Sequence, residues 1–121
     1  DALEHYLASL QADPDFLETH FFLGILYQDR LGRPADALEQ FDWVLERDPG
    51  NMVVLYNKAV ALFALGELER AKDIVQSLLE SDPGSEKYRN LMLQIERNET
   101  ATESGNWTQG GSLEPVVDKI Q

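Results

Sequence analysis

The sequence predicts an all-α, right-handed solenoid built from helix–turn–helix repeats, and two observations support this prediction. First, Pro14, Pro49 and Pro83 each follow an aspartate and lie 35 and then 34 residues apart. A period of this length is typical of helical solenoids, in which each unit buries its apolar face only by stacking on its neighbours. Second, apolar residues recur at the helical spacing of three and four nearly throughout residues 1–97.

The first three helices are expected over about 1–12, 16–31 and 35–48. The first begins with the sequence Asp-Ala-Leu-Glu, which recurs near the start of the third. The second ends at Gly32, where a left-handed residue would let the chain reverse. The third opens with Pro34, because a residue in the first turn of a helix does not need its N–H.

The next three helices are expected over about 52–65, 68–81 and 85–97. Gly66 ends the fourth helix as Gly32 ends the second, and Pro83 ends the fifth. After each Asp-Pro turn comes a residue whose side chain suits the N-cap of the following helix. These residues are Asp15, Asn51 and Ser85.

After Asn98 the helical pattern stops. The segment 99–111 is small, polar and glycine-bearing, which is typical of a linker. Apolar residues return in 112–121, where either a short helix from Pro115 or an extended strand would fit. We therefore expect a repeat domain over 1–97 and a flexible linker with an apolar tail over 98–121. The repeat domain would consist of a half repeat (1–14), two repeats (17–51 and 52–85) and a terminal helix (85–97).

Composition limits the classes of function. A chain of 121 residues with 43% hydrophobic and 26% charged residues is ordinary for one soluble domain. Cysteine is absent, which excludes disulfides, thiolate nucleophiles and cysteine-based zinc sites. The formal net charge of −12 argues against nucleic acid and anionic membranes as partners, because both require a basic surface. The acidic surface fits a basic partner or simply solubility.

The sequence does not indicate one compartment. Its longest apolar stretch, 59–65, is far shorter than the roughly 20 residues of a membrane-spanning helix, so no direct membrane insertion is expected. No secretory signal is visible, but the chain starts in mid-helix at Asp1, which is typical of a fragment of a longer protein. The localisation stays unknown; a soluble cytoplasmic or periplasmic setting would fit.

The repeated residues resemble the tetratricopeptide repeat (TPR), a 34-residue helix–turn–helix unit with characteristic aromatic, Leu-Gly, Tyr, Ala, Phe and Pro positions. The central unit presents them in order as His20, Leu23, Gly24, Tyr27, Ala37, Phe41 and Pro49, with His20 in place of the aromatic residue. The next unit is a looser match through Leu55, Lys58, Ala59, Leu62, Ala71, Val75 and Pro83. The first unit survives only as its second helix, and the resemblance covers about 1–97.

The resemblance gives the small residues a packing role. Gly24, Ala37, Ala59 and Ala71 would allow close helix approach. Large neighbours would fill the space around them; these are Tyr27, Phe41, Leu62 and Val75. The one extra residue near Pro34 should be absorbed in a turn.

The resemblance also implies a concave groove lined by the first helix of each pair. The partner-binding residues would be Phe21, Phe22, Ile25, Tyr56, Asn57, Val60, Phe63 and Lys87. The same face would include Glu18, Gln28, Asp29, Val53, Asn90 and Gln94. So much aromatic surface is typical of a binding site. The alternative is that part of this set is buried between adjacent units or under the missing first helix of the first unit.

Some members of the family hold a C-terminal carboxylate with Lys and Asn, then Asn, then Lys and Arg. The corresponding residues here are Phe21, Ile25, Asn57, Lys87 and Leu91, so only two of the five match. We therefore predict no binding of chaperone tails through a clamp of that kind.

No catalytic residue, metal site or cofactor is expected. His5 and His20 lie in different units without a repeated carboxylate partner, and a packing or surface role is expected for both. The chain has no phosphate-binding loop, no dinucleotide-binding glycine motif and no recognisable nucleophile motif. The sequence Asn106-Trp107-Thr108 is a glycosylation sequon in form only.

Two hypotheses for function remain. The first is a non-enzymatic protein–protein interaction module or scaffold that binds a protein or peptide partner in its groove. The second is a self-assembly or structural role, in which the same surface and the exposed face of residues 2–10 stack on another copy to form a homo-oligomer. An enzyme is disfavoured, because no acid, base or nucleophile constellation can be assembled.

The tail adds one further hypothesis. Its large apolar residues would dock onto the solenoid, in the same molecule or a neighbouring one; these are Trp107, Leu113, Val116, Val117 and Ile120. Burying each side chain contributes about 1.5–3 kcal/mol, and ordering about ten residues costs roughly 10–20 kcal/mol, so docking should be marginal and reversible. The alternative is a disordered C-terminus.

Overall fold

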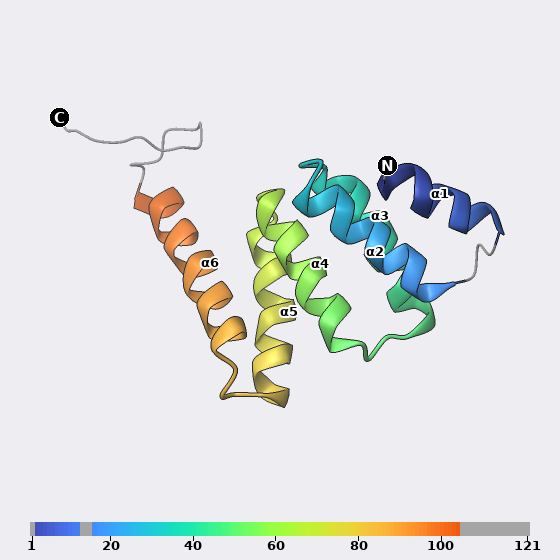
Figure 1. The fold of residues 1–121 in the computed structure, drawn as a ribbon. Helices are drawn as coiled ribbons and strands as arrows, with labels where there is room; N and C mark the ends of the chain where they lie inside the picture. Colours follow the sequence, from blue (N-terminus) through green and yellow to red (C-terminus); the bar gives the residue numbers. More distant parts are fainter. Residues whose placement is uncertain (1, 13–15, 105–121) are drawn as a thin grey trace.

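The computed structural model describes residues 2–12 and 16–104, and within these ranges the chain forms six α-helices and no strand (Figure 1). The helices are α1 (Ala2–Ala12), α2 (Leu17–Asp29), α3 (Pro34–Arg47), α4 (Met52–Ala64), α5 (Leu68–Ser81) and α6 (Glu86–Ser104). Each helix packs against the next in sequence, and α4 also touches both α2 and α6. The predicted all-α repeat architecture is confirmed, with α2–α3 and α4–α5 as its two complete helical pairs.

The reversals within the two pairs follow the predicted glycine chemistry. Gly32 and Gly66 adopt positive φ angles of 61° and 83°, which side chains with a Cβ rarely adopt. The turn between α2 and α3 spans residues 30–33, whereas the turn between α4 and α5 spans only 65–67. The extra residue of the repeat over 17–51 is therefore absorbed in the turn before Pro34, as expected.

Two of the three predicted N-caps are confirmed. The Asn51 Oδ1 accepts a hydrogen bond from the Val54 backbone N–H at 3.1 Å, and Ser85 Oγ accepts one from the Tyr88 N–H at 3.3 Å. Such caps satisfy backbone donors that the first turn of a helix leaves without partners. The expectation for α2 is wrong by one position, because Phe16 rather than Asp15 occupies its N-cap and makes no side-chain cap bond.

The last helix is longer than its apolar pattern indicated. The apolar pattern predicts an end near residue 97, but α6 continues to Ser104. Lys72 on α5 donates to Glu99 Oε1 at 3.0 Å, and this contact joins the added turns to the preceding helix. The pairing raises the pKa of the Lys72 ammonium above its ordinary value. Part of the segment expected to be a linker is therefore helical, and residues 105–121 lie outside the described residues.

The first core cluster lies between α2, α3 and α4. Its fully buried members are Ala37, Phe41, Val44, Val54 and Ala61. Phe41 reaches across to α2, where a Cβ built on Gly24 would stand 2.5 Å from the ring atom Cε1. Because real Cβ atoms do not approach that closely, the two helices can adopt this separation only with glycine at position 24.

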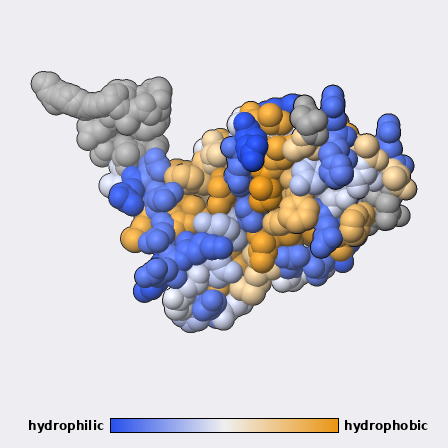
Figure 2. Space-filling view, viewed as in Figure 1, coloured by the Kyte–Doolittle hydropathy of each residue, from blue (hydrophilic) through white to orange (hydrophobic). Residues whose placement is uncertain are grey.

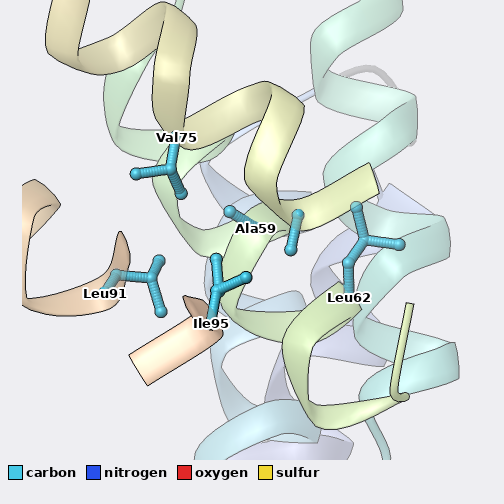
Figure 3. Close-up of a cluster of buried hydrophobic side chains, with 6 residues drawn as sticks. Ala59, Leu62, Val75, Leu91 and Ile95 are labelled. Atoms are coloured by element: carbon cyan, nitrogen blue, oxygen red, sulfur yellow. The ribbon is translucent and has the colours of Figure 1, made fainter. Parts of the chain in front are cut away.

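The second core cluster lies between α4, α5 and α6. Figure 3 shows side chains from all three helices meeting in it, including Ala59, Val75 and Ile95. The cluster consists of Ala59, Leu62, Ala71, Val75, Leu91 and Ile95, each 5% exposed or less. Since Leu91 and Ile95 come from α6, this helix covers the apolar side of the second repeat. The small residues predicted to permit close packing are thus buried in both repeats.

Candidate functional site

Three helices form one broad face of the molecule. α4 lies between α2 and α6 and contacts both, and Figure 1 shows the three running in roughly similar directions. Figure 2, viewed from the same side, shows hydrophobic surface gathered along the middle of this face, with hydrophilic residues on either side. We call this surface of α2, α4 and α6 the groove face. It is built from the helices that the sequence predicted to line a groove.

A solvent-open pocket lies in the groove face where α2 and α4 meet the end of α3. It has a volume of about 190 Å³, and we call it the α2–α4 pocket. Its lining residues are Leu17, Glu18, Phe21, Val44, Asn51, Val53 and Val54. Val53 is 61% exposed, so it presents apolar surface to solvent at the edge of the pocket. Glu18 is the one charged residue of this lining, so the pocket is an apolar depression with an acidic rim.

Asn51 lines the α2–α4 pocket and also makes two hydrogen bonds within the protein. Its Oδ1 caps α4, and its Nδ2 donates to Asp48 Oδ2 at 3.1 Å. Both ends of the amide are therefore occupied within the protein. Asn51 therefore both lines the pocket and caps the start of the helix that carries Val53 and Val54.

An aromatic cluster joins α4 to α6 on the same face. The Tyr56 and Tyr88 ring centroids are 5.8 Å apart, and Lys87 Nζ lies 5.0 Å from the Tyr56 centroid. A cation over an aromatic face is attracted by the ring quadrupole. Partial burial, with a smaller contribution from Tyr88, raises the pKa of the Tyr56 phenol above its ordinary value.

Alkaline pH should weaken the fold through these groups. A raised pKa in the folded state means that the folded protein holds its proton more tightly than the unfolded chain does. The contribution of Tyr56 to folding stability is fully present below its unfolded-state pKa of 10.0, and that of Lys72 below its unfolded-state pKa of 10.5. Each contribution is lost as the pH rises through the raised pKa that the group has in the folded protein. We expect urea midpoints to be flat between pH 7 and 9 and to fall above pH 10. In Tyr56→Phe the fall should be smaller; an unchanged fall would show that this phenol does not contribute.

Two of the predicted groove residues, Phe22 and Ile25, border a different cavity. Phe22 stacks on Tyr6 of α1 with ring centroids 6.2 Å apart, and it is 44% exposed. Phe22 and Ile25 line a second cavity, of about 310 Å³, between α1 and α2. The complete lining is Ala2, Tyr6, Phe22, Ile25, Leu26, Asp29 and Arg30. This α1–α2 pocket shares no lining residue with the α2–α4 pocket, and the predicted set is therefore divided.

The remaining groove residues serve partly in packing. Phe21 packs against the first core cluster, with its ring 6.2 Å from that of Phe41. Val60 and Phe63 pack against the second cluster. Asn57 Nδ2 donates to the Val53 carbonyl at 2.9 Å within α4. Tyr56, Val60 and Phe63 are thus all partly buried against the second cluster, whereas Val53 and Lys87 are exposed.

The sequence did not predict a stacked cluster of His20, Trp43 and Arg47. Its one sign was the histidine at an aromatic position of the repeat. The His20 ring stacks on Trp43 with centroids 3.5 Å apart, and Arg47 Cζ lies 3.6 Å from the Trp43 centroid on α3. His20 Nδ1 and Gln40 Oε1 are 2.8 Å apart. His20 is buried, so the expected packing role for this histidine is confirmed. The aromatic position of the repeat is filled by an imidazole that keeps a stacking partner.

Three of the residues that correspond to the carboxylate clamp pack against the core clusters. Leu91 is 5% exposed inside the second core cluster, while Phe21 and Ile25 pack against the first. Among the described residues no group of three or more His, Asp or Glu is placed to hold a metal ion. In the same ranges no helix combines the length and hydrophobicity needed to cross a membrane.

Comparison with known proteins decides the family. The family model described as "Tetratricopeptide repeat" matches residues 30–95, which is more than half of the chain. The chain belongs to the tetratricopeptide repeat family. The matched segment runs from the turn before α3 into α6 and includes most of both core clusters.

Similar proteins were found in sequence and in structure. Human "FK506-binding protein-like" is 45% identical over 53 residues, which are 44% of this chain and 15% of that protein. This chain thus spans only a small part of the curated relatives it matches. The first TPR domain of Spaghetti (RPAP3), bound to an HSP90 peptide, has a TM-score of 0.72 at 22% identity, over 81% of this chain and 77% of that one. The Sgt2 TPR domain from Aspergillus fumigatus has a TM-score of 0.72 at 17% identity, over 98% and 75% of the two chains.

Proposed function

We propose that this chain is a non-enzymatic protein-interaction module that binds a peptide or helix of a partner protein on the groove face. The observation that supports this most is the α2–α4 pocket, because it is apolar, open to solvent and bordered by the exposed Val53. Exposed apolar surface rimmed by polar residues usually marks a site of protein interaction.

The structural neighbours support the class of ligand. The first TPR domain of Spaghetti is bound to an HSP90 peptide, and the second TPR domain of human RPAP3 is in complex with an HSP70 peptide. We propose that the same face of this chain holds an extended segment of another protein. The chemistry of that segment differs, because Phe21, Ile25 and Leu91 stand where three clamp residues would be needed.

Val53→Glu should strongly weaken peptide binding while leaving the fold intact. The substitution places a charge at the mouth of the α2–α4 pocket, and a buried charge without a partner is strongly unfavourable. A peptide display library panned on residues 1–121 supplies the ligands, and we expect at least a tenfold loss of affinity for the selected peptides. Leu93→Glu is the matched control, since Leu93 is 53% exposed on α6 and lines neither pocket.

Equal binding by wild-type protein and Val53→Glu would contradict the proposed site. The double variant Phe21→Ala with Tyr56→Ala is a poorer test, because both rings also pack against core residues and their loss lowers stability. Circular dichroism of Val53→Glu at the temperature of the binding experiment shows whether the helices remain folded.

Self-assembly remains the alternative proposal. The exposed Leu7 on α1 and Phe22 on α2 would form the contact between copies. Light scattering at several concentrations separates the two, because a groove-binding module stays monomeric while binding peptide. Residues 105–121 lie outside the described residues, so docking of Trp107, Leu113, Val116, Val117 and Ile120 stays a prediction.

A further inference from the structure

Three side chains hold equivalent places on the groove face. Glu18, Val53 and Lys87 are each the second residue of their helix, in α2, α4 and α6 respectively. Because α4 lies between the other two helices, the three residues form a row across the groove face near the helix starts. The row runs from an acid through an apolar residue to a base.

The acidic end of the row belongs to the α2–α4 pocket. Glu18 is exposed and lines the pocket together with Val53. Asp48 adds a second negative charge nearby, because its carboxylate accepts from the pocket residue Asn51. The cation on Arg47, in contrast, lies over the Trp43 ring and contacts Glu46. The pocket therefore combines an apolar depression with a negative edge.

The basic end of the row is formed by Lys87, whose ammonium lies 5.0 Å from the Tyr56 ring centroid. Tyr56 in turn is one helical turn from Val53 on α4, so the apolar and basic parts of the row are continuous. Within residues 2–12 and 16–104 no ion pair joins Glu18 or Lys87 to another residue. Both charges are thus available to a ligand.

From this row we infer that the groove face prefers an extended peptide in which a basic side chain, a large aliphatic side chain and an acidic side chain follow in that order. The base pairs with Glu18, the aliphatic side chain enters the α2–α4 pocket, and the acid pairs with Lys87. This inference rests on the proposed function and specifies its ligand. The acid is a side-chain carboxylate within the peptide and not a chain terminus.

The dimensions of the row set the spacing of the peptide. Packed helices lie about 8–10 Å apart, so two such spacings place Glu18 and Lys87 about 16–20 Å from each other. An extended chain advances about 3.3 Å per residue and directs alternate side chains to the same side. The base and the acid are therefore about six residues apart, with the aliphatic residue two positions from the base.

Two capped heptapeptides test the inference. The first is acetyl-Lys-Ser-Leu-Ser-Ser-Ser-Glu-amide, and the second exchanges only the lysine and the glutamate. The second peptide cannot place base and leucine two residues apart in either chain direction, although its composition and net charge are the same. In NMR titrations of residues 1–121 we expect the first to bind about three- to tenfold more tightly, because exposed charge pairs are individually weak. High salt should reduce this difference.

A charge-exchanged protein supplies the reciprocal test. Glu18→Lys combined with Lys87→Glu keeps the net charge, and both side chains are exposed, so the fold should persist. This double variant should prefer the second peptide. Equal affinities of the two peptides for wild-type protein, or an unchanged preference in the double variant, would overturn the inference.

The outcomes separate this inference from the proposed function. If library-selected peptides bind in a Val53-dependent way but show no preferred order of basic and acidic residues, the proposed function stands and the inference is overturned. If no peptide depends on Val53, both fail. The segment 114–119 of this chain, read from its C-terminal end, also has a base, an aliphatic residue and an acid. A shift of the Trp107 indole resonance in the charge-exchanged protein would identify this segment as the occupant and overturn the assignment to a partner.

Discussion

Phe41→Ala is expected to lower the free energy of unfolding by about 3–5 kcal/mol, because it removes a fully buried aromatic ring. The ring fills the space between α2, α3 and α4, so the cavity left behind would be shared by both repeats. For a domain of this size such a loss is a large part of the total stability. Urea denaturation measures it, and a loss below about 1 kcal/mol would contradict the packing described.

Substituting Gly24 tests the contact with Phe41 from the opposite helix. Alanine usually stabilises a helix interior relative to glycine by about 0.5–1 kcal/mol, but here the new Cβ would meet the Phe41 ring, and overpacking costs about 1–3 kcal/mol. Gly24→Ala should therefore destabilise the wild-type protein and be better tolerated beside Phe41→Leu, which shortens the opposing side chain. Gly50→Ala is the matched control, because no atom lies within 4 Å of its added Cβ. Additive effects of the two core changes would contradict the contact.

Ile95→Ala is expected to cost about 2–5 kcal/mol and to loosen mainly the C-terminal part of the solenoid. Ile95 is fully buried against α4 and α5, and repeat proteins lose stability unit by unit because each unit contacts only its neighbours. Amide hydrogen exchange should accelerate most in α5 and α6.

Leu93→Ala removes a similar amount of apolar side chain from the same helix, where it is 53% exposed, and should change little. Equal losses from the two variants would show that α6 does not cover the second repeat. Uniform loosening of all six helices by Ile95→Ala would show that the solenoid unfolds as one unit.

Much of the fold follows from the sequence because its signals are local. Proline and glycine fix the turns by steric rules that involve only neighbouring residues, and Gly32, Pro34 and Gly66 are in the places expected. The small residues at the repeat positions predicted which helices approach closely. The end of α6 was not predictable in this way, since the contact between Lys72 and Glu99 joins residues 27 positions apart.

The candidate site was predicted only in part. A helical repeat pattern identifies the side of α2 and α4 that faces the groove, but it does not say which of those residues a neighbouring helix covers. Phe22 and Ile25 border α1, and Val60 and Phe63 pack between α4, α5 and α6. The role of Val53 and Asn51 at one pocket required knowing how α3 ends beside α4.

The most direct test of the account is an amide NMR titration of residues 1–121 with a library-selected peptide whose binding depends on Val53. We expect resonances near Glu18, Val53, Tyr56 and Lys87 to shift together and to saturate at one peptide per chain. The exposed sides of α3 and α5 should not respond. Shifts confined to α3 and α5, or to α1 and the α1–α2 pocket, would place the binding site elsewhere and contradict the assignment to the groove face.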